Sequence, residues 1–431
     1  MPNQIEEEIM VDEKLFEKLT TRIKNSRAEF IELERLLTSI PALGPINGGK
    51  GEWPKAKALW QYLEKAGFGK PEEYHASDAT VPEGTRPNLV FRIPGKKQSP
   101  TIWFLTHLDV VPPGEGWNQD PFTLKVETDR VIGRGVEDNQ QGLVSTVMAA
   151  RAFIEEKIAP EHPIALVFVS DEETGSKFGV QYLLDNHKLF APDDIIVVPD
   201  AGLPDGTMIE VAEKSILWLR VDTQGQQCHA STPYLGKNAL MAAAKLMTKV
   251  EEMRKKFGQK DPIFDPPHST IEPTKKPANG IDNVNTIPGK DTFFLDCRIL
   301  PNYNSLDVLE FIKQKGREVE EEMAGNGYYA NTPVKIEVSI FHHEPSAPPT
   351  PADAPVVGGL KEGIKKVYGV EGKPMGIGGG TVAALLRRKG YKAVVWSKMD
   401  ELAHQPNEYA KIDNLLGDAQ VFAYLCLKPS W

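Results

Sequence analysis

The sequence has few cysteines, no long apolar run and no excess of positive charge, and each absence excludes a class of protein. Its three cysteines, Cys228, Cys297 and Cys426, are odd in number and far apart, which excludes a disulfide scaffold and a Cys-x-x-Cys zinc site. No stretch approaches the roughly 18 consecutive apolar residues that a membrane-spanning helix requires. The net charge of −10 argues against a nucleic-acid surface, for which a basic patch is expected. We therefore expect neither a membrane nor a nucleic acid as a partner.

Length and composition indicate a globular protein of more than one domain. The chain has 431 residues, which is too long for one ordinary core. Its hydrophobic content of 40% and charged content of 26% are close to typical globular usage. The first ten residues, M-P-N-Q-I-E-E-E-I-M, are acidic where a signal peptide would be basic and then apolar, so we expect a cytoplasmic protein.

The rest of the chain is organised around the stretch 164–175, which reads I-A-L-V-F-V-S-D-E-E-T-G. An apolar run rich in β-branched residues is typical of a strand buried on both faces, and this one ends at the adjacent acids Glu172 and Glu173. Adjacent carboxylates repel one another unless a proton or a cation lies between them. One carboxylate could bind a metal while the other handles protons. The alternative is an acidic turn in solvent.

Other predicted strands also end in side chains that can bind metals. One apolar strand runs into His107 and Asp109, and another precedes Asp200. Asp138 lies just before a predicted helix, where capping the helix is the alternative role. For His107 and Asp109 the alternative is a polar loop after a core strand. Ligands of open α/β sheets bind outside the carboxyl ends of the strands, so we expect these side chains to converge on one crevice.

Two further segments carry local signals. Apolar residues at three- and four-residue intervals predict one long amphipathic helix, or two in tandem, over residues 13–39. A glycine run at 376–381 is predicted to open another helix, with neither P-loop nor dinucleotide spacing. Exposed backbone N–H groups at such a helix start would suit a substrate carboxylate.

The pattern of the chain changes at about Lys214. From there, alternating strands and amphipathic helices replace the continuously apolar strands. A proline-rich segment at 345–351 marks the end of this region. We therefore predict a discontinuous α/β domain made of residues 1–213 and 345–431, with an inserted α+β domain at 214–344.

Taken together, the motifs of the chain resemble those of one enzyme family. The sequence carries T-H-L-D-V-V-P, G-W-x-x-D-P-F, G-R-G-x-x-D, D-E-E-x-G and A-H-Q-P-N-E-Y in that order. It thereby resembles the co-catalytic metallohydrolases that include acetylornithine deacetylase, succinyl-diaminopimelate desuccinylase, aminoacylase, glutamate carboxypeptidase and the cytosolic dipeptidases. The resemblance implies a zinc-exopeptidase-like catalytic domain, with a central mixed sheet flanked by helices. It also implies an inserted ferredoxin-like α+β domain that serves as a lid and for dimerisation.

The resemblance implies a role for each residue of the crevice. One metal would be bound by His107 and Asp200, and the second by Glu173 and His404. Asp138 would bridge the two metals. Two histidines and three carboxylates suit Zn²⁺, with Mn²⁺ or Co²⁺ as alternatives. The two remaining acids would be catalytic: Asp109 would orient His107, and Glu172 would be the general base.

Further roles are implied for the inserted domain and the glycine run. His229, in the sequence G-x-x-C-H-A-S-T-P, would reach into the site of a partner subunit and stabilise the oxyanion, which implies a homodimer. Taken without the resemblance, His229 reads as a structural histidine. Asn285 and Arg298 would contact substrate. A substrate carboxylate would be bound by the backbone of Gly379, Gly380 and Thr381, with Arg298 and Arg387 as alternatives.

The expected reaction is hydrolysis of an amide bond in a small amino-acid derivative, or short peptide. The first reading is deacylation of an N-acyl amino acid, as in acetylornithine deacetylase and succinyl-diaminopimelate desuccinylase. Asp200 stands where such deacylases usually carry glutamate, a substitution more typical of aminopeptidases and dipeptidases, so exopeptidase action is the alternative. A third reading is a non-catalytic binding or regulatory protein on the same scaffold. Glu172 argues against it, because a binder has no need of a base.

Overall fold

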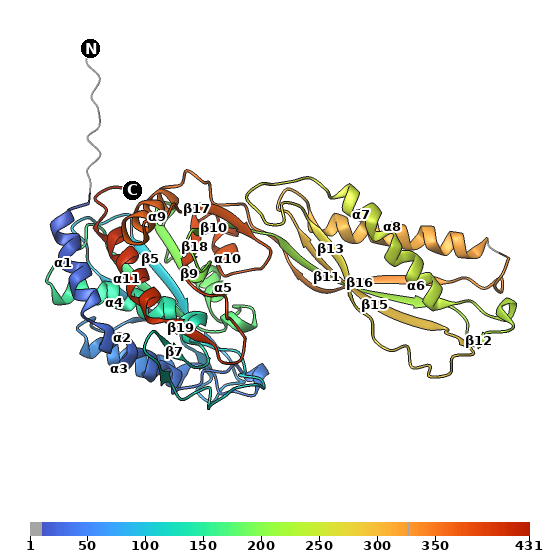
Figure 1. The fold of residues 1–431 in the computed structure, drawn as a ribbon, viewed down its shortest axis with the longest axis horizontal. Helices are drawn as coiled ribbons and strands as arrows, with labels where there is room; N and C mark the ends of the chain where they lie inside the picture. Colours follow the sequence, from blue (N-terminus) through green and yellow to red (C-terminus); the bar gives the residue numbers. More distant parts are fainter. Residues whose placement is uncertain (1–10, 326) are drawn as a thin grey trace, which may run out of the picture. The chain divides into compact units, whose positions relative to one another are not determined.

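The computed structural model describes residues 11–325 and 327–431, and contacts within the chain divide it into two compact units (Figure 1). Unit 1 comprises the chain up to Val211, together with Thr350–Met375 and Thr381–Trp431. Unit 2 comprises Ala212–Pro349 and Gly376–Gly380. The acidic N-terminal segment on which the cytoplasmic prediction depends lies outside the described residues.

The centre of unit 1 is a mixed sheet whose strands are, in spatial order, β1 (Glu72–Glu73), β4 (Leu89–Ile93), β8 (Ile164–Val169), β5 (Ile102–His107), β9 (Ile195–Gly202), β18 (Ala393–Ser397), β10 (Met208–Glu213) and β17 (Lys373–Ile377). β5 is parallel to β8 and β9, and β9 is parallel to β18. The carboxyl ends of these four strands therefore lie at one edge of the sheet. β4 and β10 run antiparallel to their neighbours β8 and β18.

Helices cover both faces of this sheet. Trp103 and Leu105 of β5 pack in one buried cluster with residues of α5 (Val180–Asn186) and α10 (Ala383–Arg388). Phe104, on the opposite face of the strand, packs on Phe422 of α11 (Ile412–Leu427), with ring centroids 5.0 Å apart. The other helices of unit 1 are α1 (Glu13–Lys24), α2 (Arg27–Thr38), α3 (Trp53–Lys65), α4 (Gly142–Glu155) and α9 (Pro355–Tyr368).

Shorter elements surround the edge of the sheet at which β5, β8 and β9 end. A small antiparallel sheet has the order β19 (Tyr409–Lys411), β7 (Arg130–Ile132) and β6 (Lys125–Val126). β2 (Ala76–Ser77) pairs with β3 (Thr85–Arg86). Unit 1 also contains the 3-10 turns η1 (Pro45–Asn47) and η3 (Glu172–Thr174) and the π-helical segment η2 (Val136–Gln141), whose backbone is not helical at Asp138 and Asn139.

Unit 2 is built around an antiparallel sheet with the order β13 (Thr270–Lys275), β15 (Lys290–Ile299), β11 (Ser215–Gln224) and β16 (Lys335–Glu344). Alternate residues of β11, such as Leu217 and Leu219, pack in a buried cluster with the helices. The helices are α6 (Ala239–Thr248), α7 (Val250–Lys256) and α8 (Ser305–Ala324), and the smaller elements are β12 (Cys228–His229), β14 (Thr286–Ile287) and η4 (Pro233–Leu235).

The element order and strand order of unit 2 are those of a ferredoxin-like fold. The predicted fold class, a helix-flanked mixed sheet with an inserted ferredoxin-like α+β domain, is therefore confirmed. Within residues 11–325 and 327–431, no helix is both long enough and apolar enough to cross a membrane.

Candidate metal centre

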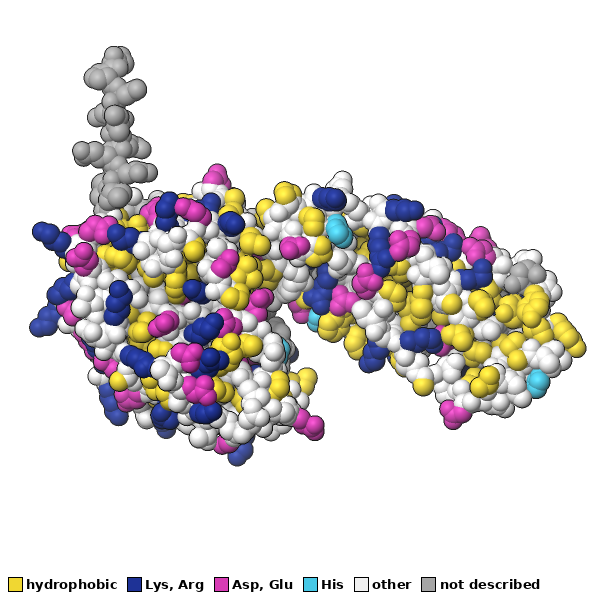
Figure 2. Space-filling model, in the orientation of Figure 1, with side chains coloured by type: hydrophobic (Ala, Val, Ile, Leu, Met, Phe, Trp, Pro, Cys, Tyr) yellow, Lys and Arg dark blue, Asp and Glu magenta, His cyan; other side chains and the backbone are white. Residues whose placement is uncertain are grey.

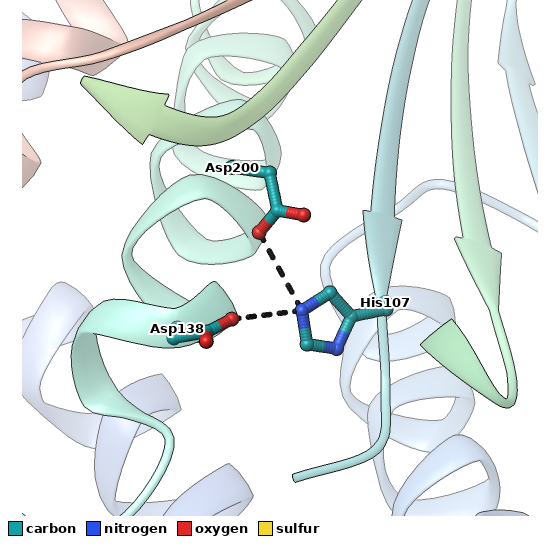
Figure 3. Close-up of side chains that lie close together, drawn as sticks. All are labelled: His107, Asp138 and Asp200. Atoms are coloured by element: carbon teal, nitrogen blue, oxygen red, sulfur yellow. Dashed lines mark hydrogen bonds and ion pairs between the residues drawn. The ribbon is translucent and has the colours of Figure 1, made fainter. Parts of the chain in front are cut away.

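Three of the predicted metal ligands meet at the carboxyl ends of β5 and β9. His107 is the last residue of β5 and is buried. Its Nε2 lies 3.0 Å from Oδ1 of Asp138, in η2, and 3.5 Å from Oδ1 of Asp200, in β9. Figure 3 shows both carboxylates directed at this one nitrogen. One ligand atom from each of the three residues lies within 4.8 Å of the others, which is close enough to hold a metal ion.

A second group forms beside the first. His404, in the loop between β18 and β19, places its Nε2 3.0 Å from Oε2 of Glu173 and 3.3 Å from Oδ2 of Asp138. Glu173 comes from η3, the turn that directly follows β8. Ligand atoms of these three residues also lie within 4.8 Å of one another.

Asp138 belongs to both groups and offers a different oxygen to each. Oδ1 is the oxygen nearest His107, and Oδ2 is the oxygen nearest His404. A carboxylate that bridges two cations needs this division of its oxygens. The whole donor set is two imidazole nitrogens and three carboxylates, a mixture that suits Zn²⁺ and, as alternatives, Mn²⁺ and Co²⁺. The side chains therefore fit a pair of divalent ions.

Asp109 contacts both His107 and the turn that carries the two glutamates. Its backbone carbonyl accepts a hydrogen bond from Nδ1 of His107 at 3.0 Å, and its carboxylate Oδ1 lies 3.6 Å from the same nitrogen. With the proton on Nδ1, Nε2 presents its lone pair to the group of ligands. The Asp109 carboxylate accepts hydrogen bonds from the backbone N–H groups of Glu172 at 3.1 Å and Glu173 at 3.0 Å.

The site carries an excess of negative charge. Burial, with the charges of Asp200 and Glu173, raises the pKa of Glu172 well above its usual range. Hydrogen bonds to Asp138 and Glu173 raise the pKa of His404 to about 10. Both shifts arise because carboxylates converge on a space with few positive charges, and bound divalent cations would relieve this repulsion.

Asn139 is a supporting residue that the sequence analysis did not single out. Its Nδ2 donates hydrogen bonds to the carboxylate of Asp200 and, at 2.8 Å, to the carbonyl of Pro199. Its Oδ1 accepts a hydrogen bond from the backbone N–H of His107 at 3.3 Å. The Asp138–Asn139 peptide bond is cis. Asn139 thus ties β5 to β9, and the one available signal for it was its position directly after Asp138.

Glu408 is a second supporting residue that was missed. Its buried carboxylate accepts hydrogen bonds from the backbone N–H groups of Gly135 (2.9 Å), Glu137 (2.8 Å) and Asp138 (3.0 Å). It also forms an ion pair with the buried Arg134, at 2.6 Å. Glu408 therefore fixes the backbone that presents Asp138. The available signal was its place in the A-H-Q-P-N-E-Y motif.

In unit 2, the predicted residues His229 and Asn285 lie together. His229 pairs with Thr286 across β12 and β14, and the Asn285 carbonyl accepts a hydrogen bond from Ala230 at 2.7 Å. The backbone N–H of Ser231 donates to Nδ1 of His229 at 3.2 Å. In the neutral ring this leaves the proton on Nε2, so the exposed side of the ring presents a hydrogen-bond donor.

The remaining predicted substrate contacts are divided between the units. Gly379 and Gly380 belong to unit 2 and Thr381 to unit 1. Arg298 forms an ion pair with Asp296 at 2.7 Å and donates a hydrogen bond to the carbonyl of Gly378 at 3.0 Å, so it is held next to the glycine run. Arg387 is buried and forms an ion pair with Glu210 at 2.9 Å, which disfavours it as a substrate contact.

Residues 103–428 match the family described as Peptidase family M20/M25/M40. The chain belongs to this family. A family relative, an uncharacterized metallohydrolase of Methanocaldococcus jannaschii, is 39% identical over 91% of this chain and 98% of its own length. A succinyl-diaminopimelate desuccinylase of Sulfurovum sp. is 25% identical over 75% of this chain and 83% of its own. The crystal structure of aminopeptidase PepT from Bacillus cereus has a TM-score of 0.71 and 21% identity, covers 95% of this chain and 98% of that one, and shares the fold.

Membership of family M20/M25/M40 confirms the predicted resemblance and makes the chain a metal-dependent hydrolase of amide or peptide bonds. The matched region contains every residue of the two ligand groups. It begins at residue 103, so helices α1 to α3 and strand β4, which precede it, are not part of the family match.

Proposed function

We propose that this chain is a di-metal amidohydrolase that cleaves the amide bond of a small N-acyl amino acid. The observation that carries the proposal is the pair of three-residue ligand groups that share Asp138. Glu172 lies beside these groups and belongs to neither, so it is free to act on protons. A site built only to hold metals needs no such carboxylate.

When bound, the two divalent ions would polarise the amide carbonyl and make a water molecule more acidic. Glu172 would accept the proton of the attacking water and pass it to the leaving amine nitrogen. Asp109 holds the backbone of Glu172, so it fixes the position from which the base acts.

Two observations bear on the substrate. The likeness to the Sulfurovum desuccinylase supports an N-acyl amino acid. Asp200, at a position where deacylases of the family usually carry glutamate, supports a dipeptide as the second candidate. In both cases the product is a free amine, and the substrate carries a carboxylate. For that carboxylate we propose Arg298 and the backbone of Gly379 to Thr381.

We further propose that the protein is a cytoplasmic homodimer assembled through unit 2. In this dimer His229 would donate a hydrogen bond from Nε2 to the developing oxyanion in the partner subunit's site. The hydrogen bond from Ser231 to Nδ1 supports this role, because it leaves Nε2 as the donor.

The proposed function is tested by release of free amine from a panel of substrates by Zn²⁺- or Mn²⁺-loaded protein. The panel contains N-acetylornithine, N-succinyl-diaminopimelate, other N-acyl amino acids and unblocked dipeptides. We expect turnover of blocked amino acids only. Turnover confined to free dipeptides would instead identify a dipeptidase and make Asp200 the better guide.

The matched control is Glu172→Gln, which preserves the shape of the side chain and removes the base. We expect the variant to bind the same amount of metal as the wild type and to lose about 10²- to 10⁴-fold in kcat. Undiminished turnover in this variant would contradict the role assigned to Glu172.

A further inference from the structure

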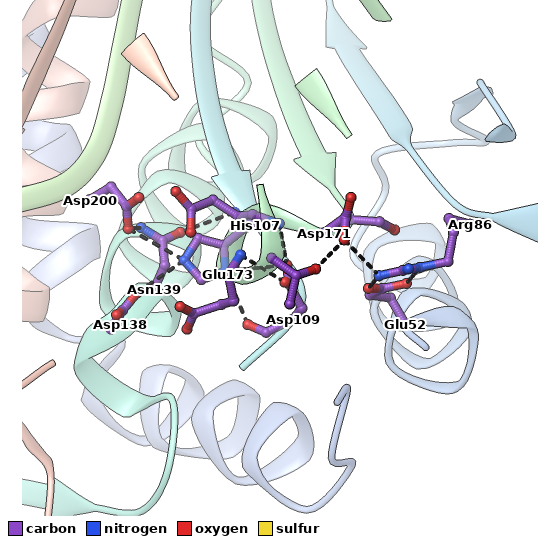
Figure 4. Close-up of polar contacts among 12 residues, drawn as sticks. Glu52, Arg86, His107, Asp109, Asp138, Asn139, Asp171, Glu173 and Asp200 are labelled. Atoms are coloured by element: carbon purple, nitrogen blue, oxygen red, sulfur yellow. Dashed lines mark hydrogen bonds and ion pairs between the residues drawn. The ribbon is translucent and has the colours of Figure 1, made fainter. Parts of the chain in front are cut away.

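A network of buried charged side chains connects the region before the family match to the turn that carries Glu172. Its centre is Arg86, the last residue of β3, whose side chain is 2% exposed. The guanidinium contacts three carboxylates, those of Glu52, Asp78 and Asp171. Figure 4 shows this network of side chains beside the candidate metal centre, with Arg86 and Glu52 at one end of the view and Asp200 at the other.

On one side, Arg86 is anchored to two structural acids. Nε donates to Oε2 of Glu52 at 2.6 Å, and Nη2 contacts the other oxygen of the same carboxylate, so the pair is bidentate. Glu52 is fully buried at the N-terminus of α3. Nη1 lies 3.3 Å from Oδ2 of Asp78. These bonds fix the plane of the guanidinium.

On the other side, Nη2 of Arg86 lies 3.5 Å from Oδ1 of Asp171, the residue directly before Glu172. Asp171 has φ 67° and ψ 22°, in the left-handed region that non-glycine residues rarely adopt. The same carboxylate accepts hydrogen bonds from the hydroxyl of Thr174 and, at 3.1 Å, from the backbone N–H of Phe178. The turn is therefore closed around the Asp171 carboxylate.

The direction of Glu172 depends on this turn. A left-handed residue at the end of β8 reverses the chain, and the next two residues are the proposed base and the metal ligand Glu173. Asp109 holds their N–H groups from one side. Arg86 balances the negative charge of Asp171 and holds its carboxylate from the other side. Without it, the unfavourable backbone conformation at Asp171 would lose a partner that maintains it.

We propose that Arg86 is a positioning residue for the reaction, which holds Asp171 in its left-handed conformation and thereby aims Glu172 at the site. The inference rests on the proposed role of Glu172 as base. Arg86 touches neither substrate nor metal ligand, and it lies outside residues 103–428, which match the family. Its sequence signal, T-R-P-N-L before a strand, resembles an ordinary surface arginine.

The test compares Arg86→Lys with Asp194→Asn, at saturating metal. Lysine keeps the positive charge, but it lacks the planar guanidinium with which arginine contacts Glu52 and Asp171 at the same time. We expect Arg86→Lys to lower kcat about 10- to 100-fold with little change in KM, as a displaced base would. Asp194→Asn weakens a buried hydrogen bond to Nε1 of Trp103 outside this network, so it should lower stability and leave kcat within about twofold.

Removing a buried charge can prevent folding, because its partners are then left unpaired. The double variant Arg86→Gln, Glu52→Gln replaces the bidentate ion pair by neutral amides and guards against this outcome. We expect it to fold and to show the same loss of kcat as Arg86→Lys. Wild-type kcat in this double variant would overturn the proposal.

A second readout needs no substrate and separates this inference from the proposed function. Hydrogen exchange of the backbone amides at 172–178 should be at least tenfold faster in Arg86→Lys than in the wild type, and unchanged in Asp194→Asn. Unchanged exchange in Arg86→Lys would overturn the proposal whatever the activity. Faster exchange in a protein whose wild type cleaves no member of the panel would support the positioning role and reject the proposed function.

Discussion

Individual carboxylates in this molecule are assigned to different tasks by their surroundings. Asp138 faces two histidines, Asp109 accepts backbone N–H groups, and Asp171 is neutralised by a guanidinium. A buried carboxylate without a hydrogen-bond donor or a cation would be unfavourable at each of these positions, because burial disfavours its charged form. Glu172 differs from these three acids, because none of these contacts gives its carboxylate a cation or a hydrogen-bond donor. It is therefore the group able to exchange a proton.

A buried acid outside the two ligand groups gives a prediction for the pH dependence of stability. Asp418, in α11, is fully buried and accepts hydrogen bonds from Ser397, Lys398, Gln141 and Tyr368. Burial is the main cause that raises its pKa from 3.8 to about 6. The folded state therefore binds this proton more tightly than the unfolded state, and the contribution to stability is lost as pH rises from about 4 to 6.

We expect the free energy of unfolding to fall by about 3 kcal/mol over this interval from Asp418 alone. In Asp418→Asn that fall should be absent, because the amide does not titrate. Urea unfolding at a series of pH values measures the slope. Ser397→Ala is the control, since it lowers stability but keeps the titrating carboxyl. Equal slopes for wild type and Asp418→Asn would contradict the assignment.

The candidate ligands could be predicted from sequence because each follows an apolar strand or lies in a compact motif. His107 and Asp200 are examples, and their nearness follows from parallel strands that end at one edge. Arg86 and Glu52 could not be predicted in this way. A charged residue in a sequence normally predicts an exposed position. Arg86 and Glu52 can be buried because they pair with each other, although 34 residues separate them in the sequence.

At the scale of elements, helices α2 and α3 each bury one ionisable side chain, Glu34 and Lys55. Glu34 of α2 is fully buried, and within the described part of the chain its two carboxylate oxygens have no hydrogen-bond partner. Lys55 of α3 is 2% exposed. Burial raises the pKa of Glu34 and lowers that of Lys55 to about 8, and the charge of each residue opposes the shift of the other. The two side chains therefore interact through their charges, one from each helix.

We expect Lys55→Met alone to lower the free energy of unfolding by about 3 kcal/mol, because it removes a buried positive charge that acts on several carboxylates, Asp109 and Glu34 among them. The double variant Glu34→Leu, Lys55→Met should regain the stability of the wild type or exceed it, since the desolvation of both charges is removed. Urea unfolding of the wild type, the two single variants and the double variant gives the coupling energy. Glu32→Leu, at an exposed position of α2, should change stability by less than about 0.5 kcal/mol. Additive losses in the double variant would rule out the coupling.

The periodicity of apolar residues predicted most elements correctly and failed at positions of proline and glycine. The segment 13–39 forms two helices, α1 and α2, as one of the two predicted alternatives. β9 continues through Pro199 and Asp200, although a proline usually marks the end of a central strand. The glycine run at 376–381 was expected to open a helix, but it overlaps the end of β17, and α10 begins only at Ala383. Glycine imposes no backbone preference that a pattern could reveal.

At the scale of the whole molecule, unit 2 exposes large apolar side chains on α6 and the adjacent turn η4. Tyr234 is 62% exposed, Leu235 54%, Leu240 38% and Met241 45%. Figure 2 shows hydrophobic side chains gathered over the region that Figure 1 labels α6 and β12. We call these four residues the apolar patch. Exposed apolar side chains that gather on one surface mark an interaction site, and a two-fold dimer uses the same surface on both copies.

We expect the wild-type protein to sediment as a dimer and the double variant Leu240→Asp, Met241→Asp to sediment as a monomer. Two carboxylates placed in a self-complementary interface meet their own copies, so burial and repulsion act together and should weaken association by at least about 100-fold. Leu306→Asp is the matched control, because Leu306 is 40% exposed on α8, outside the apolar patch, and should leave the dimer intact. Sedimentation equilibrium over a range of concentrations distinguishes these cases. If His229 acts across the interface, the monomeric variant should also lose turnover while it keeps its metal content. A wild-type protein that is monomeric and fully active would contradict both the dimer and the role of His229.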